Sequence, residues 1–256
     1  MYYIGIDIGS TAAKVAVRGQ ENFEFIMPTG WNSKETAQTI RERLMSRGIN
    51  TEDSAVKVVA TGYGRAAVEY ADRCITEITC HARGGRELGG GNCAVIDVGG
   101  QDTKVILIEN GMVQDFLMND KCSAGTGKFL EIMANRLGVT LEELFDLAAQ
   151  GETISISSLC TVFAESEVIN YIGEGRKRED IAAGVVDSVA AKVAQLALRK
   201  NLPEQVILTG GLSGNAYFAD ILSKKIERTV RSENYGRYAG ALGASLLAEE
   251  KYERRK

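Results

Sequence analysis

A repeat offset by 90 residues constrains this chain more than any other feature of its sequence. Residues 4–18 read IGIDIGSTAAKVAVR and residues 94–108 read AVIDVGGQDTKVILI. An acid, a glycine and a lysine recur at one spacing, in the aligned pairs Asp7 and Asp97, Gly9 and Gly99, Thr11 and Gln101, and Lys14 and Lys104. Two β-rich runs around a glycine-containing turn are typical of a β-hairpin. Two matching hairpins predict two related lobes.

The remaining periodicity predicts a strand–strand–strand–helix–strand order in each lobe. Further strands are expected at 21–27, 55–62, 111–119 and 206–211, and helices at 33–48, 79–89, 126–137, 140–150, 162–173, 179–200, 215–226 and 237–251. We therefore expect an α/β fold with two lobes around a cleft, joined near GGGN at 89–92. Lobe I comprises residues 1–92 plus about 232–256, and lobe II comprises residues 93–231.

Composition narrows the class of protein. The net charge of −4 and the pI of about 5.3 offer no basic surface for nucleic acid. No apolar run reaches the roughly 20 residues of a membrane helix, and the first residues read as a strand, not as a signal peptide. We expect a cytoplasmic protein without a membrane partner. The five cysteines include no CxxC pair, and His81 is the only histidine, for which we expect a local hydrogen bond.

The two hairpin turns have the chemistry of a triphosphate site. Glycine lets backbone amides approach phosphate oxygens, and carboxylates suit Mg²⁺ bound through water. We expect Asp7 and Asp97 to hold Mg²⁺, Lys14 to meet phosphate, and Gln101 or Asp102 to orient the attacking water. The phosphate-facing turns would be Gly9, Ser10 and Thr11 in lobe I, and Gly99 and Gly100 in lobe II. Either aspartate alone could equally well cap a turn.

Three further glycine-rich segments complete the expected site. VILTGGLSGN at 206–215 is a buried strand running into Gly210 and Gly211, which would approach adenine or ribose, with Ser213 or Asn215 opening a helix. Gly240 and Gly243 are spaced for close helix contact between the lobes. SAGTGK at 123–128 lacks the Walker A spacing, because Cys122 and Phe129 occupy the required Gly and Ser/Thr positions. Gly125 and Gly127 instead indicate a tight entry to a helix near the cleft.

These motifs together resemble the actin, Hsp70 and sugar-kinase superfamily. TGYGR (61–65), TCHARG (79–84), DVGGQDTK (97–104), NDKCSAGTGKFLE (119–131) and SSLCTVFAESEV (157–168) are similar, within it, to the BadF/BadG/BcrA/BcrD ATPase family and its 2-hydroxyacyl-CoA dehydratase activators. The resemblance spans nearly the whole chain. It implies an actin-like, Hsp70-like ATPase fold with a ribonuclease H-like motif, binding ATP or ADP with Mg²⁺.

The two cysteine segments carry the most specific part of the resemblance. Cys122 and Cys160 each precede a predicted helix, with Thr161 as the expected cap of the second. Composition alone favours two small buried thiols, the commonest state of free cysteine. The resemblance implies that both ligate one [4Fe–4S] cluster shared by a homodimer. It also implies a ferredoxin or flavodoxin donor and an iron–sulfur acceptor such as a 2-hydroxyacyl-CoA dehydratase. Cys74, Cys80 and Cys93 are expected to be structural.

Other readings of the same fold stay open. A small-molecule (sugar) kinase would need a sugar pocket and a carboxylate base, and it gives no reason for the two cysteine segments. The second alternative is a non-enzymatic, actin-like polymerising module. The acceptor could also be a double-cubane cluster protein or a benzoyl-CoA reductase-like enzyme. The sequence departs from the family at Gly214, where the activators carry Gln before the Asn, and near Arg237, where they often carry Gln. These departures bear on contacts to the nucleotide.

Overall fold

The computed structural model describes residues 1–156 and 160–253. Residues 157–159, the first three of the second cysteine motif, and residues 254–256 lie outside the described residues. The chain divides into two compact units. Unit 1 comprises Met1–Val95, Ile106–Asp115 and Tyr235–Lys256, and unit 2 comprises Ile96–Val105 and Phe116–Asn234.

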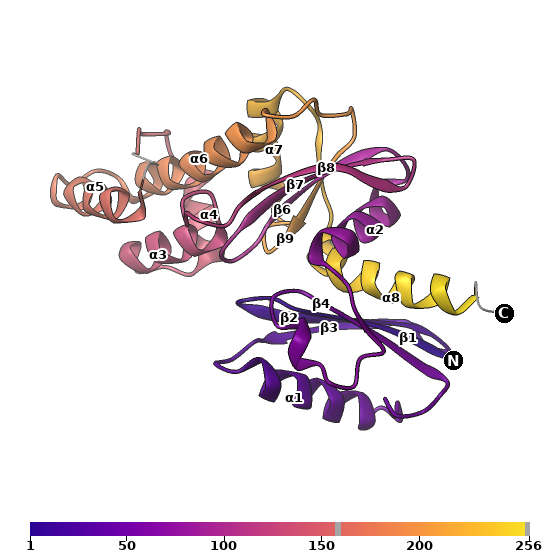
Figure 1. The fold of residues 1–256 in the computed structure, drawn as a ribbon. Coiled ribbons are helices and arrows are strands. Elements are labelled where there is room, and N and C mark those ends of the chain that lie inside the picture. Colours follow the sequence, from indigo (N-terminus) through magenta and orange to yellow (C-terminus); the bar gives the residue numbers. More distant parts are fainter. Residues whose placement is uncertain (157–159, 254–256) are drawn as a thin grey trace. The chain divides into compact units, whose positions relative to one another are not determined.

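Unit 1 is built on a five-stranded sheet with a helix on each face (Figure 1). The strand order is β3 (Phe23–Pro28), β2 (Ala12–Gly19), β1 (Tyr2–Ile8), β4 (Val56–Thr61) and β5 (Arg73–Cys74). β1 runs antiparallel to β2 and parallel to β4. α1 (Ser33–Met45) packs on one face and α8 (Ala239–Glu253) on the other. Six of the seven β1 residues are buried, as expected of a central strand covered on both faces.

Helix caps set the ends of the first two helices. The side chain of Asn32 accepts from the Lys34 amide at the start of α1, which ends at Met45, three residues before the predicted end. α2 (Glu77–Gly89) begins two residues earlier than predicted, because the Thr76 hydroxyl accepts from the Thr79 amide. It ends at Gly89 and is followed by the C-cap Gly90, whose φ of 73° is the left-handed conformation that favours glycine.

Small residues let α8 approach α2 and β1 inside unit 1. A Cβ on Gly243 would lie 1.8 Å from the Cys80 carbonyl oxygen, and one on Gly84 would lie 1.9 Å from the Ala239 carbonyl oxygen. A Cβ on Gly5 would lie 1.8 Å from the Ala241 carbonyl oxygen. The expectation that the α8 glycines serve a contact between lobes is therefore wrong for Gly243. Its neighbour is α2 of the same unit.

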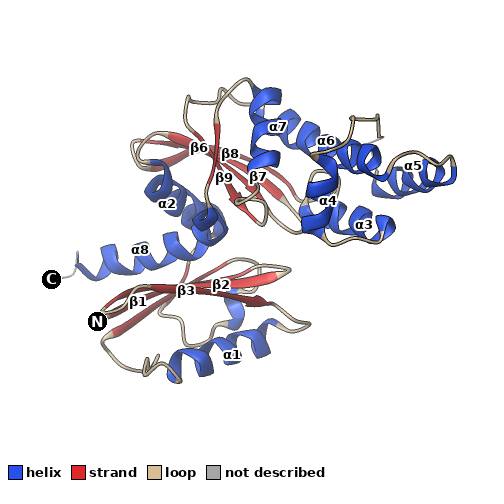
Figure 2. Cartoon of the chain, turned by 180° about the vertical axis from the view of Figure 1, so that it is seen from behind, coloured by secondary structure: helices blue, strands red, loops and turns tan. Residues whose placement is uncertain are grey.

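Unit 2 contains most of the second sheet and five helices. The strand order is β10 (Val230–Ser232), β9 (Val206–Gly210), β6 (Cys93–Val98), β7 (Thr103–Glu109) and β8 (Met112–Asn119), and the division between the units runs through β6, β7 and β8. The helices are α3 (Gly127–Leu137), α4 (Leu141–Ala148), α5 (Thr161–Gly173), α6 (Arg178–Ala197) and α7 (Ala216–Ile226). α6 is the most buried of them and contacts α3, α4, α5 and α7. α5 lies at the end of the unit away from its strands (Figure 2).

The predicted strands and helices are confirmed within a few residues, and so is the α/β class. Two short edge strands, β5 and β10, were not predicted, because two or three residues carry no readable periodicity. The last helix begins two residues later than expected, after a 3₁₀ turn at Asn234–Tyr238. Among the residues that the structure describes, no helix is both long and apolar enough to cross a membrane.

Candidate nucleotide turns and cysteine segments

The β1–β2 turn in unit 1 is fixed by hydrogen bonds to Ala12 and Thr29, and its tip is exposed to solvent. The Gly9 amide donates to the Ala12 carbonyl at 3.2 Å. The Thr29 hydroxyl donates to the Gly9 carbonyl at 2.7 Å, and the Thr29 amide donates to the Thr11 carbonyl at 3.1 Å. Ser10 and Thr11 remain exposed. The turn therefore presents amides and hydroxyls on a rigid base, as an anion-binding turn requires.

Asp7 lies at the end of β1 in a pocket with no room for extra carbon. Its side chain is buried, and its register partner across the hairpin is Lys14. A Cβ on Gly62 would lie 2.4 Å from Asp7 Oδ1, and one on Gly240 would lie 2.6 Å from Asp7 Oδ2. The Nε2 atom of His81 lies 3.8 Å from Asp7 Oδ2. The two glycines and the imidazole thus enclose the carboxylate within unit 1.

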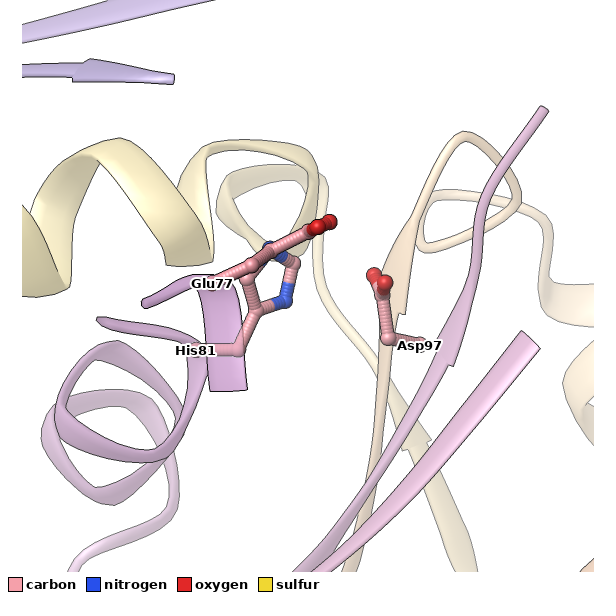
Figure 3. A group of neighbouring side chains, drawn as sticks. All are labelled: Glu77, His81 and Asp97. Carbon is pink, nitrogen blue, oxygen red and sulfur yellow. The ribbon is translucent and has the colours of Figure 1, made fainter. Parts of the chain in front are cut away.

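Lys14 and His81 differ in what surrounds them. Lys14 is half-buried, and within the described residues it has no ion-pair partner. His81 is buried on α2 one turn after Glu77, whose Oε1 lies 4.0 Å from His81 Nε2. Figure 3 shows Glu77 and His81 on α2 of unit 1 and, on β6 of unit 2, Asp97.

Because Lys14 has no ion-pair partner within the described residues, its ammonium group is available to bind an anion.

The aligned aspartate of unit 2, Asp97, is paired. The Thr209 hydroxyl donates to Asp97 Oδ1 at 3.0 Å. Lys104 Nζ lies 3.5 Å from Asp97 Oδ2 and 2.7 Å from Asp102 Oδ1, and the lysine side chain is only 2% exposed. The two carboxylates compensate part of the hydration that the buried ammonium of Lys104 has lost. Sequence reasoning did not assign Lys104 to the site, although the repeat aligns it with Lys14.

The β6–β7 turn is closed by the Gly99 amide, which donates to the Asp102 carbonyl at 2.9 Å. A Cβ on Gly99 would lie 2.6 Å from Asp102 Oδ1, so the position requires glycine. Gln101 is exposed at the tip, whereas Asp102 is held by Lys104. Of the two candidates for orienting water, Gln101 has the side chain in solvent.

The turn after β9 lies against the end of β6. Gly210 has a φ of 82°, and a Cβ there would lie 2.4 Å from the Val98 carbonyl oxygen and 2.8 Å from Asp97 Oδ1. The Gly211 amide donates to the Val98 carbonyl at 3.0 Å. Asn215 caps α7, as expected, and its Oδ1 accepts from the Phe218 amide at 2.8 Å. Because Oδ1 serves as the cap, the side-chain nitrogen Nδ2 of Asn215 is the atom that could donate to a ligand.

Cys122 lies in the loop between β8 and α3, five residues before the helix begins at Gly127. The helix predicted at 126–137 is confirmed to within one residue, and Cys122 precedes it as expected. Asn119 Nδ2 donates to the Cys122 carbonyl at 2.9 Å and to the Ala124 carbonyl at 3.2 Å. The half-buried thiol residue lines a cavity of about 550 Å³. Lys192 and Arg199 line the same cavity, which gives it a basic wall.

The start of α3 is hydrogen-bonded to the β6–β7 turn. The Gly127 amide donates to the Gly99 carbonyl at 2.9 Å, and the Lys128 amide donates to the Gly100 carbonyl at 2.8 Å. These amides are consequently not free to face the Cys122 sulfur. Gly125, with a φ of 89°, lies against α6, because a Cβ there would be 2.9 Å from the Lys192 Cβ.

Cys160 is itself the N-cap of α5, with φ −149° and ψ 138°, so the expectation that Thr161 is the cap is wrong. Its side chain makes no capping hydrogen bond. Thr161 is the first helical residue, and its Oγ1 lies 2.6 Å from Ser123 Oγ. This contact joins residues directly after Cys122 and Cys160, so both cysteine segments meet at one place in unit 2.

The other three cysteines have different environments. Cys80 and Cys93 are buried, in agreement with a structural role. Burial raises the pKa of Cys80 to about 12, so this thiol stays neutral at physiological pH. Cys74 is exposed, and packing does not explain it. Cys122 and Cys160, both half-buried, are intermediate between these cases.

The turns and the two glycine-lined aspartates define an ATPase of the actin-like α/β class. The model of the BadF/BadG/BcrA/BcrD ATPase family matches residues 4–248, and the chain belongs to this family. It is 41% identical to the (R)-2-hydroxyglutaryl-CoA dehydratase activating ATPase of Acidaminococcus fermentans, over 98% of both chains. It is 41% identical to the 2-hydroxyisocaproyl-CoA dehydratase activator of Clostridioides difficile, over 97% of this chain and 95% of that one.

Solved structures agree with this assignment. The crystal structure of the Acidaminococcus fermentans dehydratase component A superposes with a TM-score of 0.92, covering 99% of both chains at 41% identity. The Clostridium difficile activator with bound ADPNP superposes with a TM-score of 0.91, covering 100% of this chain and 97% of that one at 38% identity. A glucokinase of the ROK family from Streptomyces griseus, at 18% identity and a TM-score of 0.64, shares the fold. The predicted actin-like ATPase fold is confirmed.

Proposed function

We propose that this protein is an ATP-dependent one-electron activator. It takes an electron from ferredoxin or flavodoxin and delivers it, by way of a [4Fe–4S] cluster shared by two copies, to an iron–sulfur enzyme such as a 2-hydroxyacyl-CoA dehydratase. The observation that carries the proposal is the 2.6 Å contact between Ser123 Oγ and Thr161 Oγ1, which brings the Cys122 and Cys160 segments together. Relatives that match nearly its full length are dehydratase activators, which supports an acceptor of this kind.

The residues fit the groups that this function needs. The carboxylates of Asp7 and Asp97 are buried at strand ends, and each is packed against glycines at which a Cβ would clash, Gly62 and Gly240 for Asp7 and Gly210 for Asp97. Carboxylate oxygens are ligands that suit Mg²⁺, often through water, so both residues have the chemistry to hold the ion. Mg²⁺ bound there would supply positive charge to the phosphate oxygens. In unit 1, Lys14 and the turn Gly9–Thr11 would hold phosphate.

Unit 2 would supply the other half of the nucleotide site. We assign phosphate contacts to the turn at Gly99 and Gly100, with the Gly100 amide as the donor because the Gly99 amide donates to the Asp102 carbonyl. We assign the adenosine to Gly210, Gly211 and the side-chain amide nitrogen of Asn215. Gln101, exposed at the turn, is the residue that we expect to orient the attacking water. In this assignment lobe I is residues 1–92 plus about 232–256, and lobe II is residues 93–231.

Two thiols in one chain are half of the usual cluster ligand set. A two-fold homodimer would bring Cys122 and Cys160 of each copy together and complete it. The cluster, when bound, supplies a one-electron carrier. The surface of α5 near Cys160 favours a contact with a second copy, because four of its large apolar side chains are exposed in one chain. They are Val162, Phe163, Ile169 and Ile172. The basic side chains of Lys192 and Arg199 line the same cavity as Cys122 and would attract a negatively charged group there.

ATP would have to bind the electron-donating shape better than the resting one, because equal affinity for both shifts nothing. A one-electron transfer against ~59 mV needs about a tenfold bias. The hydrogen bonds from the α3 start to Gly99 and Gly100 give this chain a short route from the proposed phosphate turn to the Cys122 loop.

Iron and acid-labile sulfide per chain, measured anaerobically with the molar mass of the same sample, test the proposal. We expect about two irons and two sulfides per chain in a dimer, and loss of both in Cys122→Ser with ATP binding retained. Cys74→Ser is the matched control and should keep its iron, since Cys74 is exposed in unit 1. A metal-free protein after anaerobic reconstitution would exclude the activator and leave the sugar kinase as the better assignment.

A further inference from the structure

Two hydroxyl side chains connect the cysteine segments of unit 2. Ser123 follows Cys122 in the β8–α3 loop, and Thr161 follows Cys160 as the first residue of α5. Their oxygens are 2.6 Å apart, a normal length for a hydroxyl–hydroxyl hydrogen bond. The two residues are 38 positions apart in the chain, so this bond is a tertiary contact between two separately folded segments.

Ser123 lies in a loop that several hydrogen bonds hold in place. The Thr126 hydroxyl donates to the Ser123 carbonyl at 2.7 Å, and the Thr126 amide donates to it at 3.0 Å. Asn119 holds the carbonyls of Cys122 and Ala124 from the other side. Hydrogen bonds therefore hold the loop on both sides of Ser123.

The same loop is tied to the β6–β7 turn. Besides the amides of Gly127 and Lys128, the Thr103 hydroxyl of β7 donates to the Gly125 carbonyl at 2.6 Å and is buried. A hydrogen-bonded chain thus runs from Gly99 through the loop to Ser123. Thr161 is the point where this chain reaches the second cysteine segment.

We infer that Ser123 and Thr161 are positioning residues, whose mutual hydrogen bond fixes the spacing of the Cys122 and Cys160 segments. The consequence for a cluster rests on the proposed function; the spacing itself does not. Losing one hydroxyl removes the bond between segments without deleting a cysteine. Because a single hydrogen bond contributes about a fivefold bias, each segment should open about fivefold more often.

The first experiment is amide hydrogen exchange of the metal-free protein, resolved to residues 119–128 and 160–166. In Ser123→Ala we expect exchange at residues 160–166 to rise about fivefold, and in Thr161→Val exchange at residues 119–128 to rise as much. The double variant should be no worse than either single variant, because only one bond is lost. Thr161→Ser keeps the hydroxyl and should match the wild type.

Ser166→Ala is the matched control on the same helix. Its exposed hydroxyl donates to the Val162 carbonyl of its own helix at 3.1 Å and, within residues 1–156 and 160–253, bonds to no other segment. It should leave exchange at residues 119–128 unchanged. If Ser123 and Thr161 acted only within their own segments, both single variants would give the same result as this control. Unchanged exchange in the partner segment of both variants would therefore overturn the inference.

The second experiment measures release of iron to a chelator from the anaerobically reconstituted protein. We expect release to be about three- to tenfold faster in Ser123→Ala and Thr161→Val than in the wild type, Thr161→Ser and Ser166→Ala. Equal release rates in all five proteins would contradict positioning of the ligands. If the wild type takes up no iron, the proposed function fails, while the exchange experiment still decides whether the two residues position the segments.

Discussion

The Gly127 amide donates to the Gly99 carbonyl at 2.9 Å, so the first residue of α3 is bonded directly to the β6–β7 turn. The Lys128 amide makes the next such bond, to Gly100. A helix start usually directs its free amides toward an anion or a cap. Here the turn carbonyls take two of them. The turn and the helix that follows the Cys122 loop are therefore joined directly by two backbone hydrogen bonds.

The carboxylate of Asp7 is the first target for a test of the nucleotide site. Asp7→Asn keeps the shape of the side chain and removes the charge, so we expect ATP hydrolysis to fall by about a hundredfold or more with little change in the unfolding midpoint. Steady-state phosphate release measures this. Asp187→Asn is the control, because Asp187 pairs with Lys225 at 2.7 Å on α6 and α7 and should leave hydrolysis unchanged. Equal activity in both variants would remove Asp7 from the site.

The two lysines aligned by the repeat should behave differently. Lys104→Met leaves Asp97 and Asp102 without their ammonium in a buried site, and we expect it to lower the free energy of unfolding by about 3 kcal/mol. Lys14→Met breaks no ion pair within the described residues and should cost less than about 1 kcal/mol, while raising the KM for ATP. Urea unfolding of both variants compares them; similar losses would mean that burial of Lys104 is not energetically important.

Gly243 should not tolerate a methyl group. Its Cβ would meet the Cys80 carbonyl oxygen at 1.8 Å, so Gly243→Ala must push α8 away from α2 and should destabilise unit 1 by about 3 kcal/mol. In Gly173→Ala, at the end of α5, the new Cβ would have nothing within 4 Å, and the helix preference for alanine should make the change neutral or slightly stabilising. Thermal unfolding midpoints of Gly243→Ala and Gly173→Ala test this prediction. A Gly243→Ala protein as stable as the wild type would contradict the close approach of α8 to α2.

The raised pKa of Cys80 predicts a loss of stability at alkaline pH. Burial raises this pKa from 9.0 to about 12, so the folded protein keeps the proton while the unfolded chain loses it above pH 9. The stabilising contribution is complete below pH 9 and is lost as the pH rises toward 12. Between pH 8 and pH 10 we expect the wild type to lose about 1.4 kcal/mol more than Cys80→Ser. Urea unfolding of both proteins at the two pH values measures this. An equal change in the free energy of unfolding for the wild type and Cys80→Ser would contradict the prediction.

Local features of this protein could be predicted because they depend on neighbouring residues. The hairpins around Gly9 and Gly99 follow from turn chemistry between β-rich runs, and Asn215 capping α7 follows from its place before an apolar helix. The repeat also placed Asp7 and Asp97 at equivalent strand ends. The cap of α5 was misjudged because both Cys160 and Thr161 are compatible with it, and only the backbone dihedrals distinguish them.

The two hairpins, the order of helices and strands, and the family could all be predicted from residue types at fixed short spacings. Which side chains meet depends instead on the packing of distant segments. This packing placed Lys104 between Asp97 and Asp102, Gly243 against α2, and Ser123 beside Thr161. Such contacts join residues that the chain separates and that only packing brings together, so no local pattern records them.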